Sequence, residues 1–496
     1  MANYIRIDLG TTNSAVGTID STGRPQIIQN DGKSITASCV ALENDQLVVG
    51  EIPESRYGHK GFHVGARFKR YMGEEHQSSL GSKSFSPTEL SAAVLLELKK
   101  IAERQVGTVA EAVITIPANF MQEARDATMQ AAKKAGLDVK FIINEPTAAA
   151  LYYGYKAGSK LAGNYVVYDL GGGTFDVSVV EINGDNIEVL ATEGVSKLGG
   201  DDFDKALRDI AKRKFEDLTG NQVDDSLLPL SEMAKVKIKL TDREKTPFMI
   251  DGEIVEITRA EFDEEISSLV NQAELLCETV LDEAELSVSD INGVFLAGGS
   301  TRVPLVLKSI EKVFQQTPNG SENVDEVVAL GAALYAAMKS DGEHLSASQS
   351  ASIAKLQVSE ISTYYFGTLS IGYNSSRQTE ELHNSIIINK GEKIPCQSTS
   401  EFRTSHDNQT AINCRVTKSG SPETDPRFVS IVWEGELQLP ENRPEGQPIK
   451  VTYSFDENGM MHCEFLDVES GRETKIRLDN SQEAVGQSEI DKFLVD

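Results

Sequence analysis

One short pattern occurs twice in this chain, at two widely separated places. Residues 4–19 read YIRIDLGTTNSAVGTI, and residues 165–180 read YVVYDLGGGTFDVSVV. Asp8 of the first copy aligns with Asp169 of the second, and alternating apolar residues flank both turns. Each copy therefore predicts a strand, a glycine turn and a second strand. Two such copies in one chain predict two similar subdomains that face each other.

The residues of the paired turns have the chemistry of a phosphate site. Glycines let the backbone approach phosphate oxygens, and consecutive N–H groups form an anion-binding nest. The hydroxyls of Thr11, Thr12 and Thr174 are placed to donate to the same oxygens. Asp8 and Asp169 suit a hydrated Mg²⁺, which takes few carboxylates and several waters. Either copy alone also fits an ordinary hairpin turn, and it is the pair that favours a nucleotide site.

A third glycine turn follows another apolar strand, at 295–302 (FLAGGSTR). Alone, Gly298-Gly299 would fit an ordinary strand-to-helix connection. Together with the other two turns it suits the nucleoside end of a ligand, and Arg302 has the planar guanidinium that stacks on adenine. The sequence contains no GxxxxGK[ST] pattern, so this is not a P-loop enzyme.

The chain has 496 residues, which is too long for one core and predicts two or three domains. In residues 1–340, helical and strand patterns alternate, which is typical of α/β proteins. A helix is predicted over 86–106, beginning at Ser86-Pro87, then a strand over 112–116 and a helix over 121–136 that ends at a glycine.

The pattern changes at about residue 363. Short, β-branched runs separated by Gly, Asn, Pro and Asp predict an antiparallel β domain over 363–480. The segment 341–362 is expected to be a linker, because 340–356 is small and polar. The tail 481–496 would hold at most one short helix. The expected strand runs are Ser385–Ile388, Thr410–Val416, Phe428–Leu439 and Ile449–Phe455, with a hairpin turn at 456–459.

Composition excludes some partners. The net charge of -28 argues against a protein that coats nucleic acid or binds anionic membranes, although a local site can still hold a nucleotide. No stretch approaches the ~20 apolar residues of a membrane span. Five cysteines without a CxxC pair indicate reduced thiols and a cytoplasmic protein. A disulfide between Cys396 and Cys414 is the open alternative.

The combined motifs resemble those of the 70-kDa heat-shock chaperones, the DnaK-type family, over nearly the whole chain. The motifs that carry the resemblance are DLGTTNS at 8–14, NEPTAAA at 144–150, DLGGGTFDVS at 169–178, LGGDDFD at 198–204 and GGSTR at 298–302. The resemblance implies an actin-like (duplicated ribonuclease-H-like) ATPase domain followed by a β-sandwich. It also implies that hydrolysis of ATP to ADP is coupled to binding and release of extended hydrophobic polypeptide. The implied cation is Mg²⁺, and K⁺ is a further candidate. A J-domain co-chaperone and a nucleotide-exchange factor are the implied partners.

The resemblance also assigns roles to residues of this sequence. The catalytic group would be Lys69, Glu145, Asp169, Thr174 and Asp176. Magnesium or its waters would be held by Asp8, Glu145 and Asp169. Nucleotide would be bound by Asp8, Gly10, Thr11, Thr12, Asn13, Gly171, Gly172, Gly173, Gly200, Glu232, Lys235, Gly298, Gly299, Ser300, Arg302 and Asp325. Peptide would be bound by Ile371, Phe402, Ile412 and Cys414, and Pro117 and Arg125 would relay the nucleotide state.

Each of these roles has a simpler structural alternative. Lys69 lies in a Lys/Arg cluster that would usually be a solvated surface. Glu145 would suit a plain helix N-terminus, and Glu232 with Lys235 a surface pair. The peptide residues would equally suit a sandwich core. The general base stays open among three candidates, namely Lys69, Glu145 and Thr174.

Three features depart from the family pattern. The stretch IAKLQVSEIS at 353–362 is less apolar than the usual linker, which puts the coupling between domains in doubt. The helical lid is expected to be absent, because only 481–496 follows the last strand, so substrate should leave faster. Val236 and Lys239 stand where the family has other residues near adenine, so the base pocket is expected to be altered.

Two other functions fit parts of the pattern. One is a nucleotide-gated binding module or co-chaperone with little hydrolysis. The other is an actin-like small-molecule kinase, which would share the duplicated turns. The kinase needs an aspartate base in a polar substrate pocket, for which the sequence shows no motif, and it leaves the β domain without a role.

Overall fold

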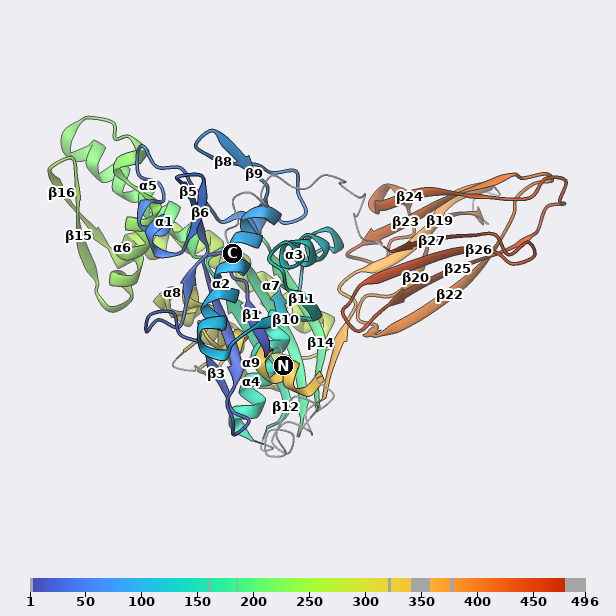
Figure 1. Ribbon diagram of the computed structural model, residues 1–496, viewed down its shortest axis with the longest axis horizontal. Helices are drawn as coiled ribbons and strands as arrows, with labels where there is room; N and C mark the ends of the chain where they lie inside the picture. Colours follow the sequence, from blue (N-terminus) through green and yellow to red (C-terminus); the bar gives the residue numbers. More distant parts are fainter. Residues whose placement is uncertain are drawn as a thin grey trace. The chain divides into compact units, whose positions relative to one another are not determined.

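The chain forms two compact units, and the division between them falls between Val358 and Ser359 (Figure 1). The computed structural model describes residues 3–158, 161–184, 186–319, 323–339, 357–374 and 379–477. Most of the expected linker and the expected tail 481–496 lie outside these residues. The two units are described separately below.

The first unit contains two sheets of the same design. In the first sheet, β1 pairs with β2 in antiparallel and with β10 in parallel orientation. In the second sheet, β12 pairs with β13 in antiparallel and with β17 in parallel orientation. The strand order is β11-β10-β1-β2-β3 in the first sheet and β17-β12-β13-β14 in the second. The duplicated sequence segments thus form equivalent hairpins at the centres of two similar sheets.

The elements built on the first sheet are called the first half. They are β1 (Asn3–Asp8), β2 (Asn13–Ile19), β3 (Pro25–Ile27), β4 (Thr36–Ala37), β5 (Cys39–Glu43), β6 (Gln46–Val49), α1 (Glu51–Arg56), β7 (Val64–Ala66), η1 (Phe68–Tyr71), β8 (Ser78–Leu80), β9 (Lys83–Phe85), α2 (Pro87–Val106), β10 (Val109–Ile116), α3 (Gln122–Lys134), β11 (Asp138–Asn144) and α9 (Val327–Lys339).

The elements built on the second sheet are called the second half. They are α4 (Glu145–Ala157), β12 (Ala162–Leu170), β13 (Phe175–Asn183), β14 (Asn186–Val195), α5 (Gly200–Thr219), η2 (Asp225–Leu227), α6 (Leu230–Asp242), β15 (Lys245–Ile250), β16 (Glu253–Thr258), α7 (Arg259–Glu283), η3 (Val288–Asp290), β17 (Ile291–Ala297), η4 (Gly299–Arg302) and α8 (Pro304–Phe314).

The expected local structure of the first unit is present. Helix α2 starts where Ser86 and Glu89 form a capping box, with a proline in the first turn. Helix α3 is slightly shorter than the predicted 121–136, and Gly136 follows it with a φ of 69°. The predicted strand over 112–116 is the end of β10.

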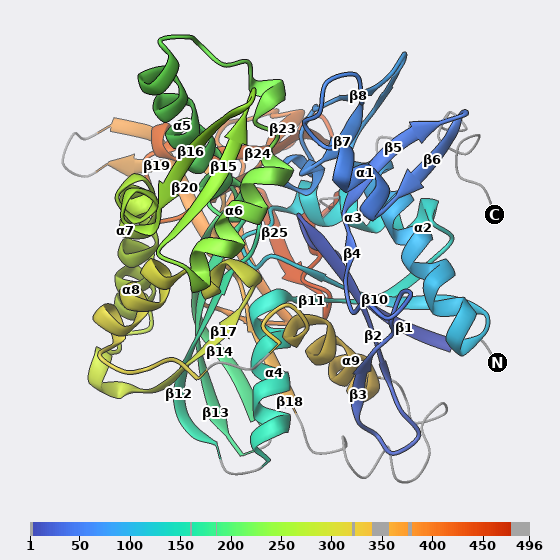
Figure 2. The ribbon, with the colours of Figure 1, turned by 90° about the vertical axis from the view of Figure 1, so that its left-hand side faces the viewer.

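The two halves meet through α4 and α9, which lie side by side between the sheets (Figure 2). Helix α9 is buried along almost its whole length. A Cβ atom on Gly331 would lie 1.7 Å from the carbonyl oxygen of Ala148 in α4. The backbones of the two helices therefore approach as closely as only a glycine allows, and this contact holds the halves together at the base of the space between them.

The second unit has two antiparallel sheets of four strands, β20-β19-β23-β24 and β22-β25-β26-β27. Their facing sides share one core that includes Val416, Tyr453 and Phe465. Strand β18 (Gln357–Ile361) begins at the end of the first unit and runs into the second. The other strands are β19 (Tyr365–Asn374), β20 (Thr379–Ile388), β21 (Lys393–Ile394), β22 (Cys396–Arg403), β23 (Ala411–Ser419), β24 (Ser430–Gln438), β25 (Pro448–Phe455), β26 (Met461–Asp467) and β27 (Glu473–Arg477), with the short helix η5 at Pro426–Phe428.

The predicted strands of the second unit are all present, and so is the hairpin turn at 456–459, where the N–H of Gly459 donates to Asp456. The last part of the expected linker is a strand instead. Residues 357–361 form β18, which pairs with β21 through Glu360 and Ile361. The alternating pattern QVSEI carries this strand, and the polar composition of the preceding residues concealed it.

All five cysteines are free thiols, so no Cys396–Cys414 disulfide forms. Among the described residues, no helix has the length and apolar character needed to cross a membrane.

The close contact between α4 and α9 predicts a stability effect. Gly331→Ala should lower the midpoint of thermal unfolding, because the new methyl group overlaps the Ala148 carbonyl; the expected cost is about 1–3 kcal/mol. Gly154→Ala in α4 is the matched control, since its Cβ would lie 3.4 Å from Ile187 and the helix gains propensity. An unfolding midpoint for Gly331→Ala equal to that of the control would contradict the packing described here.

Candidate functional site

A cavity of about 880 Å³ lies between the two halves of the first unit. The three glycine turns line it, one from the first half and two from the second. The predicted site residues that line it are Asp8, Gly10, Thr11, Thr12, Asn13, Lys69, Glu145, Asp169, Gly171, Gly172, Thr174, Lys235, Gly298, Gly299, Ser300, Arg302 and Asp325. Gly173, Asp176, Gly200 and Glu232 are not among the lining residues.

The first two glycine turns touch each other at the floor of the cavity. A Cβ atom on Gly172 would lie 1.6 Å from Thr12 Oγ1, and one on Gly173 would lie 2.3 Å from Thr11 Cγ2. Any larger residue would push the turns apart, so the glycines are required for the contact. The backbone N–H groups of both turns are thereby brought to one small space.

A serine behind the first turn fixes its shape. The Ser38 hydroxyl donates to the carbonyl of Gly10 at 2.8 Å, and the Ser38 N–H donates to the carbonyl of Thr12 at 2.8 Å. Within the turn, the N–H of Gly10 donates to the Ser14 hydroxyl at 3.1 Å. The carbonyl groups of Gly10 and Thr12 are therefore hydrogen-bonded within the protein.

The start of α5 supports the second turn in the same way. The N–H of Gly200 donates to the carbonyl of Gly171 at 3.0 Å, and the N–H of Asp201 donates to the carbonyl of Gly172 at 2.7 Å. The Ser300 hydroxyl, from the third turn, also donates to Gly171, at 2.8 Å. Gly200 therefore supports the second turn through its backbone.

Lys69 and Glu145 form a buried ion pair beside the turns. Lys69 Nζ lies 2.6 Å from Glu145 Oε1, and the two residues are 3% and 7% exposed. Lys69 comes from η1, and Glu145 is the first residue of α4. The alternative of a solvated lysine is therefore wrong, since this ammonium group is inside the cavity wall.

Four carboxylates lie around this one ammonium group, and those of Glu145, Asp169 and Asp176 are buried. Burial, and then Glu145, raise the pKa of Asp8 to about 7 and that of Asp176 to about 8. Burial, and then Glu145 and Asp176, raise the pKa of Asp169 well above its ordinary value. The site has more carboxyl groups than Lys69 can balance in their ionised form, so a bound cation would stabilise those ionised forms.

The donor set fits a hydrated Mg²⁺ with a phosphate ligand. Among the described residues, no group of three or more His, Cys, Asp or Glu side chains forms a metal cage. Mg²⁺ needs no such cage, because it is usually held by one or two carboxylates, waters and substrate phosphate. Asp8, Glu145 and Asp169 supply carboxylates at the cavity wall. The Thr12 hydroxyl is buried there without a hydrogen-bond partner in the structure, as expected of a group that donates to a ligand.

Helix α6 forms the wall opposite the third glycine turn. Its lining residues, three and four positions apart, lie on one helical face: Ser231, Ala234, Lys235, Lys237, Ile238, Thr241 and Asp242. Ile238 is 66% exposed on this face, so the wall presents apolar surface to the cavity.

The predicted residues of the base pocket must be corrected for this face. Val236 is 2% exposed and belongs to the core, and Lys239 is not among the lining residues. Glu232 accepts a hydrogen bond from Lys235 at 2.6 Å and likewise does not line the cavity. Of the two residues predicted to bind nucleotide on this helix, Lys235 lines the cavity and Glu232 does not.

Arg302, at the end of the third turn, pairs with an acidic residue. Arg302 Nη1 donates to Asp325 Oδ2 at 2.7 Å. Gly298 has a φ of 79°, and a Cβ on it would lie 2.3 Å from the Leu170 carbonyl, so this position requires glycine. The guanidinium of Arg302 is therefore oriented by Asp325, and the Arg302 side chain is still 44% exposed.

Asp176 lies behind the cavity and next to the turn that contains Pro117. It is 1% exposed, and backbone N–H groups of Asn119 and Ala118 hydrogen-bond to it, which opposes the rise in its pKa. Arg125 Nη2 donates to Asn144 Oδ1 at 3.1 Å. Asn144 directly precedes Glu145, so Arg125 is linked to the acidic cluster through Asn144. Pro117 is linked to it through the backbone that follows and hydrogen-bonds to Asp176.

Several lining residues were missed in the sequence. Arg67, Asp201, Asp204 and Lys237 line the cavity, as does Tyr57. Arg67 pairs with Asp201 at 2.8 Å, and Lys237 pairs with Asp204 at 2.8 Å. The two aspartates belong to the LGGDDFD motif, so this motif could have indicated them. Nothing in the sequence pairs Arg67 with either one.

The predicted peptide residues of the second unit differ in exposure. Ile371 is 57% exposed on β19, and Phe402 and Ile412 are half-buried against the core. Cys414 is 1% exposed within the core, where burial raises the pKa of its thiol to about 12. Cys414 therefore lies in the sandwich core, which was the alternative to a role in peptide binding.

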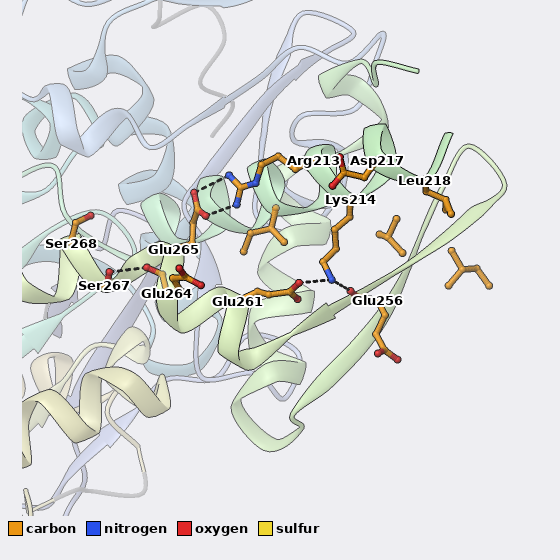
Figure 3. Close-up of a pocket in the computed structure, with 13 residues that line it drawn as sticks. Arg213, Lys214, Asp217, Leu218, Glu256, Glu261, Glu264, Glu265, Ser267 and Ser268 are labelled. Carbon is orange, nitrogen blue, oxygen red and sulfur yellow. Dashed lines mark hydrogen bonds and ion pairs between the residues drawn. The ribbon is translucent and has the colours of Figure 1, made fainter. Parts of the chain in front are cut away.

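A second cavity, of about 970 Å³, lies on the second half and contains none of the predicted residues (Figure 3). Both of its cationic side chains are paired: Arg213 with Glu265, and Lys214 with Glu261. It has neither a glycine turn nor an unbalanced buried charge, so the first cavity is the candidate site.

A cleft between duplicated halves, lined by glycine turns and a buried Lys–carboxylate cluster, together with a unit of two β-sheets, defines a two-part nucleotide-binding protein. The family model described as Hsp70 protein matches residues 4–496. This is nearly the whole chain, so the protein belongs to the Hsp70 family. Membership supports a chaperone function, with ATP binding and hydrolysis, in general terms.

The acidic cluster predicts how stability depends on pH. Between the ordinary pKa of 3.8 and the raised pKa of about 8, Asp176 keeps its proton in the folded protein and loses it in the unfolded chain. Stability should therefore fall as pH rises through this window. The unfolding midpoint of metal-free, nucleotide-free protein is expected to decrease from about pH 5 to about pH 8, and Asp176→Asn should flatten the decrease. An equal decrease in the variant would rule out this assignment.

Proposed function

We propose that this protein is an ATP-dependent chaperone in which ATP binding and hydrolysis in the first unit control binding and release of extended hydrophobic polypeptide by the second. The observation that carries the proposal is the buried Lys69–Glu145 pair in the cavity that the two touching glycine turns line. A desolvated ammonium group beside clustered backbone N–H groups is suited to the charge of a terminal phosphate. A kinase or a simple binding module has no observation of this kind in its favour.

The residues of the cleft would divide the work of hydrolysis. The N–H groups of the two turns and the hydroxyls of Thr11 and Thr12 would hold phosphate oxygens. Lys69, with Glu145 and Thr174, would orient a water molecule for in-line attack. Mg²⁺ held through Asp8 and Asp169 would neutralise phosphate charge, and K⁺ is a further candidate cation.

The adenosine would lie between the third turn and α6. Arg302, held by Asp325, would stack on the base from one side. Ile238 and Ala234 would cover the other side with apolar surface. Lys235 is the residue of the predicted ribose pair that lines the cavity.

The nucleotide state would reach the second unit through two short routes. One runs from Asp176 to the backbone that follows Pro117. The other runs from Glu145 through Asn144 to Arg125. In the second unit, Ile371, Phe402 and Ile412 would contact an extended peptide, with main-chain hydrogen bonds supplying affinity. A J-domain protein and an exchange factor are the expected partners, and the five free thiols suit a reducing cytoplasm.

Removing the ammonium group tests the catalytic assignment. Lys69→Met should lower kcat for ATP hydrolysis by about 10²–10³, because one preorganised donor is lost while the other phosphate contacts remain. Nucleotide binding, measured by calorimetry, should persist. Lys312→Met, on an exposed lysine that pairs with Glu274, is the control and should hydrolyse ATP at the wild-type rate. A Lys69→Met protein with full turnover would exclude this role.

Peptide release tests the coupling between the units. A fluorescent extended apolar peptide should dissociate faster with ATP and Mg²⁺ than with ADP, and Thr174→Ala should reduce the difference by disturbing the phosphate contacts. Ile412→Asp should abolish binding, since it places a charge at a half-buried apolar position. Ile431→Asp is the control, because Ile431 is 48% exposed in the same sheet. Equal release rates in both nucleotide states would mean that the units are not coupled.

A further inference from the structure

Arg67 crosses the cleft from the first half to the second. Its Nε lies 2.8 Å from Asp201 Oδ1 in α5, and the two side chains are 12% and 4% exposed. The guanidinium lies 4.9 Å from the centre of the Tyr57 ring, and Nη1 lies 3.9 Å from Cys39 Sγ. This is a desolvated ion pair with an aromatic ring on one side, a geometry that suits arginine and not lysine.

The backbone of Arg67 is held in an uncommon conformation. Its φ is 62°, in the left-handed region that residues other than glycine seldom adopt. Such a residue persists where its surroundings hold it, and these sites are enriched in functional positions. Here the backbone turns Arg67 into the cavity two residues before Lys69, which is part of the same wall.

The two ends of the pair are attached to the supports of the two glycine turns. Cys39, next to the guanidinium, directly follows Ser38, which holds the first turn through Gly10 and Thr12. Asp201 holds the second turn, because its N–H donates to Gly172. Movement of the halves apart would therefore break this pair and separate the turns at the same time.

Neighbouring contacts show that the pair lies where the halves close. The Ser231 hydroxyl of α6 donates to the carbonyl of Tyr57 at 3.2 Å, which is a second contact across the cleft. Arg70 and Asp202 form another cross-cleft pair, at 2.6 Å. Asp202 is shared with Lys205 and caps α5, however, and neither Arg70 nor Asp202 lines the cavity.

We propose that the Arg67–Asp201 ion pair is the latch that keeps the cleft closed over bound nucleotide and so sets the rate of nucleotide release. The inference rests on the proposed ATP site. Arg67 is a positioning residue in this role, since it acts by holding Asp201 and the second turn. The other carboxylate oxygen of Asp201 is buried without a hydrogen-bond partner in the structure, so loss of Arg67 leaves a buried charge that only opening can solvate.

The test is a double-mutant cycle on the dissociation rate of a fluorescent ADP analogue, chased with excess ATP from the full chain. Arg67→Gln and Asp201→Asn should each raise the rate by roughly tenfold or more, because each leaves one buried charge unpaired. The double variant removes both charges and should release the analogue more slowly than either single variant. Arg213→Gln, which breaks the surface pair with Glu265 (Figure 3), should leave the rate unchanged.

Each outcome decides between the proposals. Single variants that release at the wild-type rate, or a double variant whose effects simply add, would overturn the latch while leaving the ATP site intact. A wild-type protein that binds no nucleotide would overturn the proposed function, and the latch with it. Thermal unfolding of each nucleotide-free variant identifies a loss of fold, and the neutral double variant keeps the comparison valid if one single variant is unstable.

Discussion

The imbalance of buried charge at the contact between the two glycine turns governs the rest of this structure. Asp8, Glu145 and Asp169 line the cavity, Asp176 is buried behind it, and all four share one ammonium group, that of Lys69. Such a cluster costs free energy unless protons or cations neutralise it, which explains the raised pKa values. The fold supplies the rigid supports that hold these groups together, and a ligand with bound cation completes the balance.

The duplication explains how the chain brings the charges to one place. Asp8 lies at the end of β1 and Asp169 near the end of β12, so equivalent positions of two similar sheets face one space. Glycines make this possible at both levels, since Gly172 lets the turns touch and Gly331 lets α4 and α9 touch. The halves touch at α4 and α9 and again at the glycine turns. The halves can therefore separate only on the side of the cleft away from these two contacts.

Sequence reasoning succeeded where local patterns determine the structure. The glycine turns, the capped helix α2 and the strands of the second unit follow from spacing and turn chemistry. It failed where tertiary packing decides. Val236 lies on the core side of α6, and Cys414 lies inside the sandwich. The partner of Arg67 could not be predicted, because an ion pair between η1 and α5 leaves no trace in either segment.

The same electrostatics links the chemistry to the conformation. A closed cleft keeps water away from Lys69 and Glu145, which strengthens their effect on a phosphate, but it also buries Arg67 and Asp201. A buried ion pair is costly to form and more costly to leave half-paired, so its value is in selecting one arrangement of the halves. In the proposed mechanism, closure and catalysis depend on two ion pairs that the short segment 67–69 carries together, and a shift of that segment would alter both at once.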